Sequence, residues 1–279
     1  RVLVDQPDLV SAEAIARAAD NLNAAQRPVI VVGLGVEPEA PYEDLLCFAE
    51  KLGAPVLTTP KAKGSVPADH WLGSETIGLT RTDPGYELIA ESDYVVTVGM
   101  DVVEVVLPWS IAQPVLWLSS WYDKIGSGMA DQALIGPLGP TLTGLTNFLS
   151  EQQNNWGIER VSHYRKMRLG RSREASDQVQ GGVIAPQAVL RAVRLTLPSE
   201  GVLTTDVGSH KILSALEWDA TVPNRYLVSN GLSAMGFGPA AAAGAALAGL
   251  SPVVCLTGDA GLLMCAGVLS TLSQIKVPV

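Results

Sequence analysis

The sequence predicts an α/β protein with two doubly wound parallel-sheet domains, the second truncated at its C-terminus. Over residues 1–150, short β-branched runs alternate with helical patterns, which is typical of a parallel sheet with helices on both faces. Residues 151–180 are polar and rich in cations, and the alternation then resumes up to residue 279. We therefore expect a central Rossmann-like domain over 1–150, a polar helical linker over 151–180 and a second α/β domain over 181–279.

Length and composition exclude several classes of protein. A chain of 279 residues can bury two separate cores. The net charge of −9 argues against nucleic acid as a partner, because no basic surplus is available to neutralise a phosphate backbone. The N-terminal residues show no signal-peptide pattern, and the apolar stretch 239–257 consists largely of Ala and Gly and is broken by Pro252. We expect no membrane span and a cytoplasmic location.

The three cysteines, Cys47, Cys255 and Cys265, form no zinc-binding spacing. Each lies in an apolar stretch of sequence. We therefore predict three buried free thiols in a reducing compartment.

The first domain is expected to begin with a helix that follows Ser11 as its N-cap and buries Ile15, Ala18, Ala19 and Leu22. The β-branched run Val29–Val32 reads as a strand buried on both faces. The remaining expected elements are a helix over 41–52 closed by Gly53, strands over 55–58, 94–98 and 115–118, and helices around 86–90 and over 141–149.

The first strand ends in Gly33-Leu34-Gly35, which resembles the start of a dinucleotide-binding turn. The third glycine of that motif is missing, and Pro38 disfavours a helix start there. A nucleotide-binding Rossmann protein thus stays open as an alternative, but the pattern is weak.

The second domain is expected to contain a helix over 186–195, strands over 202–205 and 253–257, and an apolar helical pattern from Leu262 to Ile275. The helix over 240–248 consists almost only of Ala and Gly. Such a helix serves tight internal packing or a subunit interface.

Three glycine-containing turns are expected at the carboxyl edge of the second sheet, where open α/β sheets bind their ligands. They are Asp206–Lys211, Ser229–Pro239 and Gly258–Gly261. The last follows a strand and opens a helix, which aims backbone N–H groups at an anion. Asp259 would repel a bare phosphate, so its carboxylate points to a divalent cation between the two. The alternative is that Asp259 is simply a helix N-cap.

The segments TDVGSHK, SNGLSAMGFGPAAAAGAALAG and VVCLTGDAGLLM resemble, in order and spacing, the motifs of thiamine-diphosphate-dependent enzymes of the acetolactate synthase type. The resemblance covers nearly the whole chain, and residues 1–150, with KAKGSVPADHWLG at 61–73, look like the central domain of that family. It implies thiamine diphosphate and Mg²⁺ as cofactors, decarboxylation or carboligation of a 2-keto acid, and a homodimer or tetramer.

The resemblance also implies individual roles. Asp259 would ligate Mg²⁺, and Met235 would hold the cofactor in its bent, catalytic conformation. The remaining cofactor-binding residues would be Gly208, Ser209, His210, Ser233, Gly258, Ala260 and Gly261. His210 could instead be a plain turn residue, and Met235 could be ordinary core.

Several features depart from the family pattern. Ala260 stands where the family has a second glycine, and Ser209 where it often has Gln. The family's second metal ligand, an Asn, and its pyrimidine-domain Glu have no counterpart here, so we expect a portion of a longer enzyme; the alternative is a split or non-catalytic subunit. Asp101 and Glu104 follow the strand at 94–98, and two acids argue against FAD in the central domain.

Overall fold

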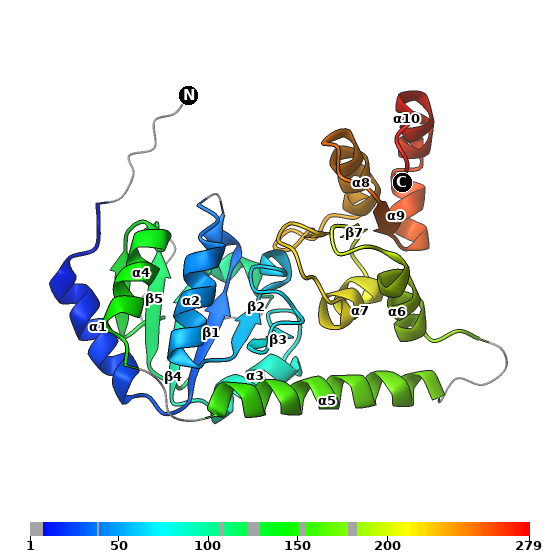
Figure 1. The fold of residues 1–279 in the computed structure, drawn as a ribbon. Helices are drawn as coiled ribbons and strands as arrows, with labels where there is room; N and C mark the ends of the chain where they lie inside the picture. The colour runs from blue at the N-terminus through cyan, green and yellow to red at the C-terminus, as the bar shows by residue number, and fades with distance from the viewer. Residues whose placement is uncertain (1–7, 38, 107–108, 122–128, 151–154, 178–182) are drawn as a thin grey trace. The chain divides into compact units, whose positions relative to one another are not determined.

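The computed structural model describes residues 8–37, 39–106, 109–121, 129–150, 155–177 and 183–279. They form two compact units, one made of residues up to Ala62 together with His70–Tyr164, the other of Lys63–Asp69 together with Arg165–Val279. Each unit has a parallel sheet with helices packed on it (Figure 1). The predicted α/β class with two parallel sheets is confirmed, while the domain boundaries at 150 and 180 stay a prediction.

The first unit is built on a six-stranded sheet with the order β3-β2-β1-β4-β5-β6. All the strand pairs are parallel. The strands are β1 (Pro28–Val32), β2 (Val56–Thr58), β3 (Gly73–Thr76), β4 (Tyr94–Val98), β5 (Val115–Ser119) and β6 (Gln132–Ile135). Every residue of β1, β4 and β5 is buried, as expected for central strands covered on both faces. The order reverses between β1 and β4, which makes their carboxyl ends the switch point of the sheet.

Four helices cover this sheet: α1 (Ala12–Ala24), α2 (Tyr42–Leu52), α3 (Pro84–Glu91) and α4 (Leu138–Phe148). The Ser11 hydroxyl accepts the Ala14 N–H at the start of α1, and the four predicted apolar residues of α1 are its buried ones. Gly53 ends α2 with a φ of 63°, a conformation that favours glycine. In Figure 1, α1, α2 and α4 lie in a row, and α1 and α2 both contact α4.

The sequence did not reveal β3 (GSET) and β6 (QALI). Both are short edge strands with few β-branched residues, so their local pattern does not differ from that of a loop.

Helix α5 (Trp156–Asp177) begins in the first unit and ends in the second. It is the helix that the polar stretch predicted. Gly181, where the second domain was expected to start, lies outside the described residues.

The second unit has a three-stranded parallel sheet with the order β8-β7-β9. Its strands are β7 (Val202–Thr205), β8 (Tyr226–Val228) and β9 (Val253–Leu256), and its helices are α6 (Pro186–Thr196), α7 (Ser209–Glu217), α8 (Phe237–Leu247), α9 (Asp259–Met264) and α10 (Gly267–Ile275). Helix α8 packs on β7 and β9, and Ala242 and Ala245 form a core there with Val202 and Val253. The small side chains of α8 thus serve internal packing.

Three features of this unit differ from expectation. The Asp206–Lys211 turn leads directly into α7, whose first residue is Ser209. Strand β8 was not predicted. The apolar pattern from Leu262 to Ile275 does not form one helix: α9 ends at Met264, Cys265 follows it with a φ of −126°, and α10 begins at Gly267.

The cysteine prediction is confirmed in one respect and wrong in another. All three thiols are free. Cys47 is exposed, because it lies on the outer face of α2, and Cys255 and Cys265 are half-buried. Among the helices that the structure describes, none is long and apolar enough to cross a membrane.

Candidate functional site

A buried carboxylate joins the three predicted turns at the carboxyl edge of the second sheet. Asp206 follows β7 directly and is fully buried. Its two carboxylate oxygens accept the Gly236 N–H at 3.0 and 2.8 Å, and Oδ2 also accepts the Thr257 hydroxyl at 3.2 Å. One side chain therefore connects the end of β7, the turn that bears Met235 and the turn that bears Asp259. The sequence analysis named Asp206 only as the first residue of a turn and did not predict that its side chain joins the three turns.

Two glycines are required because they pack on Asp206. A Cβ on Gly261 would overlap the Asp206 carboxylate, and a Cβ on Gly238 would lie 2.9 Å from the Asp206 backbone nitrogen. Gly261 is buried at the start of α9. Close packing of the turns on Asp206 thus explains why glycine stands at both positions.

His210 lies between two of the turns. A Cβ on Gly208 would come within 2.7 Å of its imidazole Cε1, and one on Gly258 within 3.2 Å of the same atom. The ring therefore fits only because both neighbours lack side chains. Burial lowers the pKa of His210 below its usual value, and the charge of Asp206 opposes this in part.

The Nε2 atom of His210 is buried without a hydrogen-bond partner among the described residues. Buried polar atoms are rarely left without a partner in folded proteins. This nitrogen is therefore ready to bond a ligand, and the reading of His210 as a plain turn residue leaves it unexplained.

Helix α7 reaches the Met235 turn through a second contact. The buried Lys211 donates from Nζ to Ser233 Oγ at 2.8 Å, and Ser233 has a φ of 50°. Ser209 is exposed at the start of α7. Met235 is 49% exposed. In the described structure it is therefore not a core residue, which was the alternative interpretation of Met235.

Asp259 is exposed on the first residue of α9, and the N-cap position belongs to Gly258. Asp259 Oδ1 accepts the N–H of Ala260 at 2.8 Å. The first backbone bond of α9 runs from Leu262 N to Gly258 O at 2.9 Å. The N–H groups of residues 259–261 thus precede the helix's own bonds, as at any helix start.

The donor set fits a metal that is shared with an anion. Within the residues that the structure describes, no three His, Cys, Asp or Glu side chains come together as they would to hold a metal ion alone. Asp259 would therefore supply one carboxylate, and Mg²⁺ takes its remaining ligands from water and from phosphate oxygens in such sites. The exposed Asp259 and the His210 ring, which packs on Gly258, suit that arrangement.

The Gly33–Gly35 turn of the first unit has no comparable vacancy. Gly33 N donates to Val98 O at 3.0 Å, and Gly35 N donates to Gly99 O at 2.7 Å. The Leu34 N–H, between them, donates to Glu104 Oε2 at 2.7 Å. All three donors of the turn are thus used by acceptors of the chain itself.

Glu104 is itself buried, and Thr59 Oγ1 donates to its Oε1 at 3.0 Å. Burial raises its pKa to about 7, although the two donated hydrogen bonds oppose this. The cavity next to the turn measures about 160 Å³, below the roughly 300 Å³ at which ligand pockets begin. Its lining comprises Leu34, Gly35, Glu37, Gly99, Met100, Asp101, Ser119 and Trp121.

Two family profiles match the chain. Residues 15–145 match the thiamine pyrophosphate enzyme central domain. Residues 206–279 match the C-terminal thiamine-pyrophosphate-binding domain of the same enzymes. The second match begins at Asp206 and includes all three turns of the candidate site.

Individual relatives agree with these profiles. The acetolactate synthase large subunit of Parasynechococcus marenigrum is 31% identical over 98% of this chain and 45% of its own length. The acetolactate synthase isozyme 3 large subunit of Escherichia coli is 27% identical over 95% of this chain and 48% of its own. A putative thiamine pyrophosphate-containing protein of Bacillus subtilis, YdaP, is 27% identical over 96% and 46%. The chain spans about half the length of the curated relatives it matches.

Proposed function

We propose that this chain, which belongs to the thiamine pyrophosphate enzyme family, is part of an enzyme that uses thiamine diphosphate and Mg²⁺ to decarboxylate or carboligate a 2-keto acid. One observation carries the proposal. The turns at the carboxyl edge of the second sheet present both the unpartnered Nε2 of His210 and the exposed carboxylate of Asp259. The names of the acetolactate synthase relatives support the type of reaction.

In this proposal, the diphosphate lies at the start of α9. Asp259 would hold Mg²⁺, and the N–H groups of Ala260 and Gly261, beside Gly258, would be the donors available to the phosphate oxygens. Ala260 can donate outward only if the Asp259 carboxylate turns away from it, which coordination of a metal would favour. His210 would donate from Nε2 to a phosphate oxygen in its protonated form, which the negative charge of the phosphate favours, and Gly208 and Ser209 would form the wall next to it.

The remaining residues orient the reactive end of the cofactor. Met235, half-exposed on its turn, would wedge between the two rings of the cofactor, and Ser233 supports that turn through Lys211. When bound, thiamine diphosphate supplies the carbon nucleophile and the electron sink for 2-keto acid decarboxylation. The chain's own contribution is to bind, to orient and to exclude water.

Calorimetric titration with thiamine diphosphate, with and without Mg²⁺, tests the proposal. We expect binding heat only with Mg²⁺, and we expect Asp259→Ala to weaken the binding about 100-fold, because Mg²⁺ then loses its carboxylate ligand and no longer holds the diphosphate at the turn. Such a factor corresponds to about 2.7 kcal/mol.

Glu200→Ala is the matched control, because Glu200 is an exposed acid in the same unit, at the amino end of β7. Binding that needs no metal and is unchanged by Asp259→Ala would refute the metal bridge. Titration with NADH in parallel tests the nucleotide-binding alternative, which the fully used donors of the Gly33–Gly35 turn do not favour.

We further propose that the central domain binds no FAD. A flavin diphosphate at the switch point of the sheet would need the N–H groups that Glu104, Val98 and Gly99 already accept. The protein should therefore purify without flavin absorbance, and added FAD should produce no heat.

A homodimer or tetramer is also part of the proposal. Large apolar side chains are exposed close to the candidate site, and they are Leu232, Met235, Leu263 and Met264. Leu232 is 98% exposed, and such side chains gather where a second subunit covers them. Sedimentation of the unaltered protein should show a self-associated species that Leu232→Ser weakens. The cytoplasmic location expected from the sequence stays a prediction.

A further inference from the structure

Helix α7 carries Ser209 and His210 on its first turn, and its other end is held by two cations. The last four carbonyl groups of a helix lack partners within the helix. In α7, Lys63 Nζ donates to the carbonyl of Ala215 at 2.8 Å, and Arg168 Nη1 donates to that of Glu217 at 3.5 Å. Cations are favourable at this end of a helix because its dipole is negative there.

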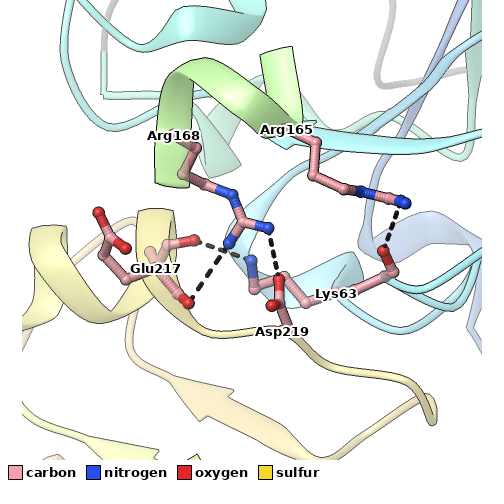
Figure 2. Close-up of polar contacts among 7 residues, drawn as sticks. Lys63, Arg165, Arg168, Glu217 and Asp219 are labelled. Carbon is pink, nitrogen blue, oxygen red and sulfur yellow. Dashed lines mark hydrogen bonds and ion pairs between the residues drawn. The ribbon is translucent and has the colours of Figure 1, made fainter. Parts of the chain in front are cut away.

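Arg168 also forms an ion pair. Its Nη2 lies 2.8 Å from Asp219 Oδ1, just beyond the helix, and the Arg168 side chain is only 16% exposed. Figure 2 shows Arg168 between Glu217 and Asp219, with Lys63 next to them. The planar guanidinium can donate to both acceptors at once, which fixes where α7 ends.

Lys63 belongs to a segment that we call the strap, residues Lys63–Asp69. The strap runs along the connection from α7 to β8. Gly64 has a φ of 91° and lies so close to the Val222 carbonyl that a side chain would overlap it. Ala68 N donates to Ala220 O at 3.0 Å, and Arg165 Nη2 donates to Ala68 O at 3.0 Å (Figure 2). These contacts hold the backbone of the strap in place, and therefore also the position from which the Lys63 side chain starts.

Strand β8 also holds α7 in place. Tyr226 is buried in β8, and its hydroxyl lies 2.9 Å from Ser214 Oγ and 3.4 Å from the Lys211 carbonyl. The Lys63 ammonium lies 5.9 Å from the centre of the Tyr226 ring, within the range of a cation–π contact. A helix of nine residues is stiff, so a displacement of its C-terminal end would move its first turn as well.

We propose that Lys63 and Arg168 are positioning residues of the candidate cofactor site, which they serve by fixing α7 and therefore His210 between Gly208 and Gly258. Neither residue touches the cofactor site. This inference rests on the proposed function, because only the proposed function supplies a ligand for the His210 ring.

The test compares Lys63→Met with the matched control Lys166→Met, which removes an exposed cation from α5. The first readout is the ring signal of His210 in a ¹H–¹³C NMR spectrum. The protein has three histidines, so His70→Gln and His163→Gln variants assign that signal. We expect Lys63→Met to shift the His210 signal at constant pH, Lys166→Met to leave it in place and Lys63→Arg to restore it.

The second readout is the affinity for thiamine diphosphate in the presence of Mg²⁺. We expect Lys63→Met to weaken it about fivefold, the effect of about 1 kcal/mol at a helix end. Arg168→Met should act in the same direction, and it replaces Lys63→Met if that variant does not fold.

An unshifted His210 signal in both variants would overturn the proposal, even if amide exchange of α7 became faster, because the cations would then be purely structural. A failure of the proposed function looks different: the unaltered protein would not bind thiamine diphosphate. The NMR comparison would then still decide whether Lys63 and Arg168 position the ring.

Discussion

The Gly33–Gly35 turn and the Gly258–Gly261 turn both follow a parallel strand at the carboxyl edge of a sheet, but they use their polar groups differently. In the first turn, Glu104 and two carbonyl groups of the chain accept all three N–H groups. In the second, the buried Asp206 accepts the hydroxyl of Thr257, directly before the turn, and Asp259 stays exposed. The first turn therefore has no N–H group left for a ligand, whereas the second keeps an exposed carboxylate.

The largest effect is expected from Gly35→Ala. The new Cβ would lie 2.6 Å from the Gly99 carbonyl oxygen, and backbone atoms cannot turn aside as a side chain can. We expect a loss of about 3 kcal/mol in the free energy of unfolding, at the upper end of overpacking costs, measured by urea denaturation. The control is Gly244→Ala in α8, where nothing lies within 4 Å of the new Cβ and helix propensity predicts a gain of up to ~1 kcal/mol. Equal stabilities of the two variants would contradict the close packing of the first turn.

Glu104→Gln is expected to change how stability depends on pH. The pKa of Glu104 is raised from 4.5 to about 7 in the folded protein, so between these values the folded state binds more protons than the unfolded state. Its contribution to the free energy of unfolding therefore falls as pH rises from about 4.5 to 7 and is constant above. At about 1.36 kcal/mol per pH unit this amounts to about 3 kcal/mol.

The amide of Glu104→Gln can still accept the Leu34 N–H while its NH₂ donates to Thr59. We therefore expect the variant to be about 2 kcal/mol more stable than the unaltered protein at pH 8 and to lose this part of the pH dependence. Thermal denaturation at pH 5, 6, 7 and 8 measures it. Glu87→Gln, at an exposed acid of α3, should leave the pH profile unchanged; the same profile in both variants would exclude Glu104 as its source.

Asp206→Asn and Asp259→Asn are expected to have the smallest effects on stability and to separate the two roles of acids in the second unit. The amide of the variant has one acceptor oxygen, whereas the Asp206 carboxylate has two. We therefore expect a loss of about 1.5 kcal/mol in the free energy of unfolding. Asp259→Asn should change the free energy of unfolding by less than ~0.5 kcal/mol, because Asp259 is exposed, while it removes metal-dependent binding of thiamine diphosphate. Chemical denaturation and calorimetry on the two variants make the comparison; a larger stability loss in Asp259→Asn would reverse our assignment.

Much of the fold could be predicted because the central strands carry a strong local signal. The bounds of β4 and β7 agree with prediction, since runs of β-branched and apolar residues between polar turns are unambiguous. Strands β3, β6 and β8 are short, and their pairing depends on neighbours rather than on their own residues. The first turn of α7 was hidden by the glycine that precedes it.

The candidate site was predictable in its motifs but not in its connections. Asp259, His210 and Met235 were singled out from three separate segments, and the family profile that matches residues 206–279 contains all three. The role of Asp206 depends on burial and on partners 30 and 51 residues away, which no local pattern encodes. The burial of Glu104 was missed for the same reason, although its acidic character was noted.

The strap has a consequence for how the second unit can assemble during synthesis. Lys63 and the Ala215 carbonyl are separated by 152 residues, so the strap emerges from the ribosome long before its partner exists. At roughly 5–20 residues per second, the strap waits on the order of 10 to 30 s. During that interval a segment between β2 and β3 must stay out of the first sheet, whose strands on both sides are already complete. The strap thus has to stay unpaired until its partner is made. Gly64 and Lys63 favour this, because Gly and Lys are both depleted in β-strands.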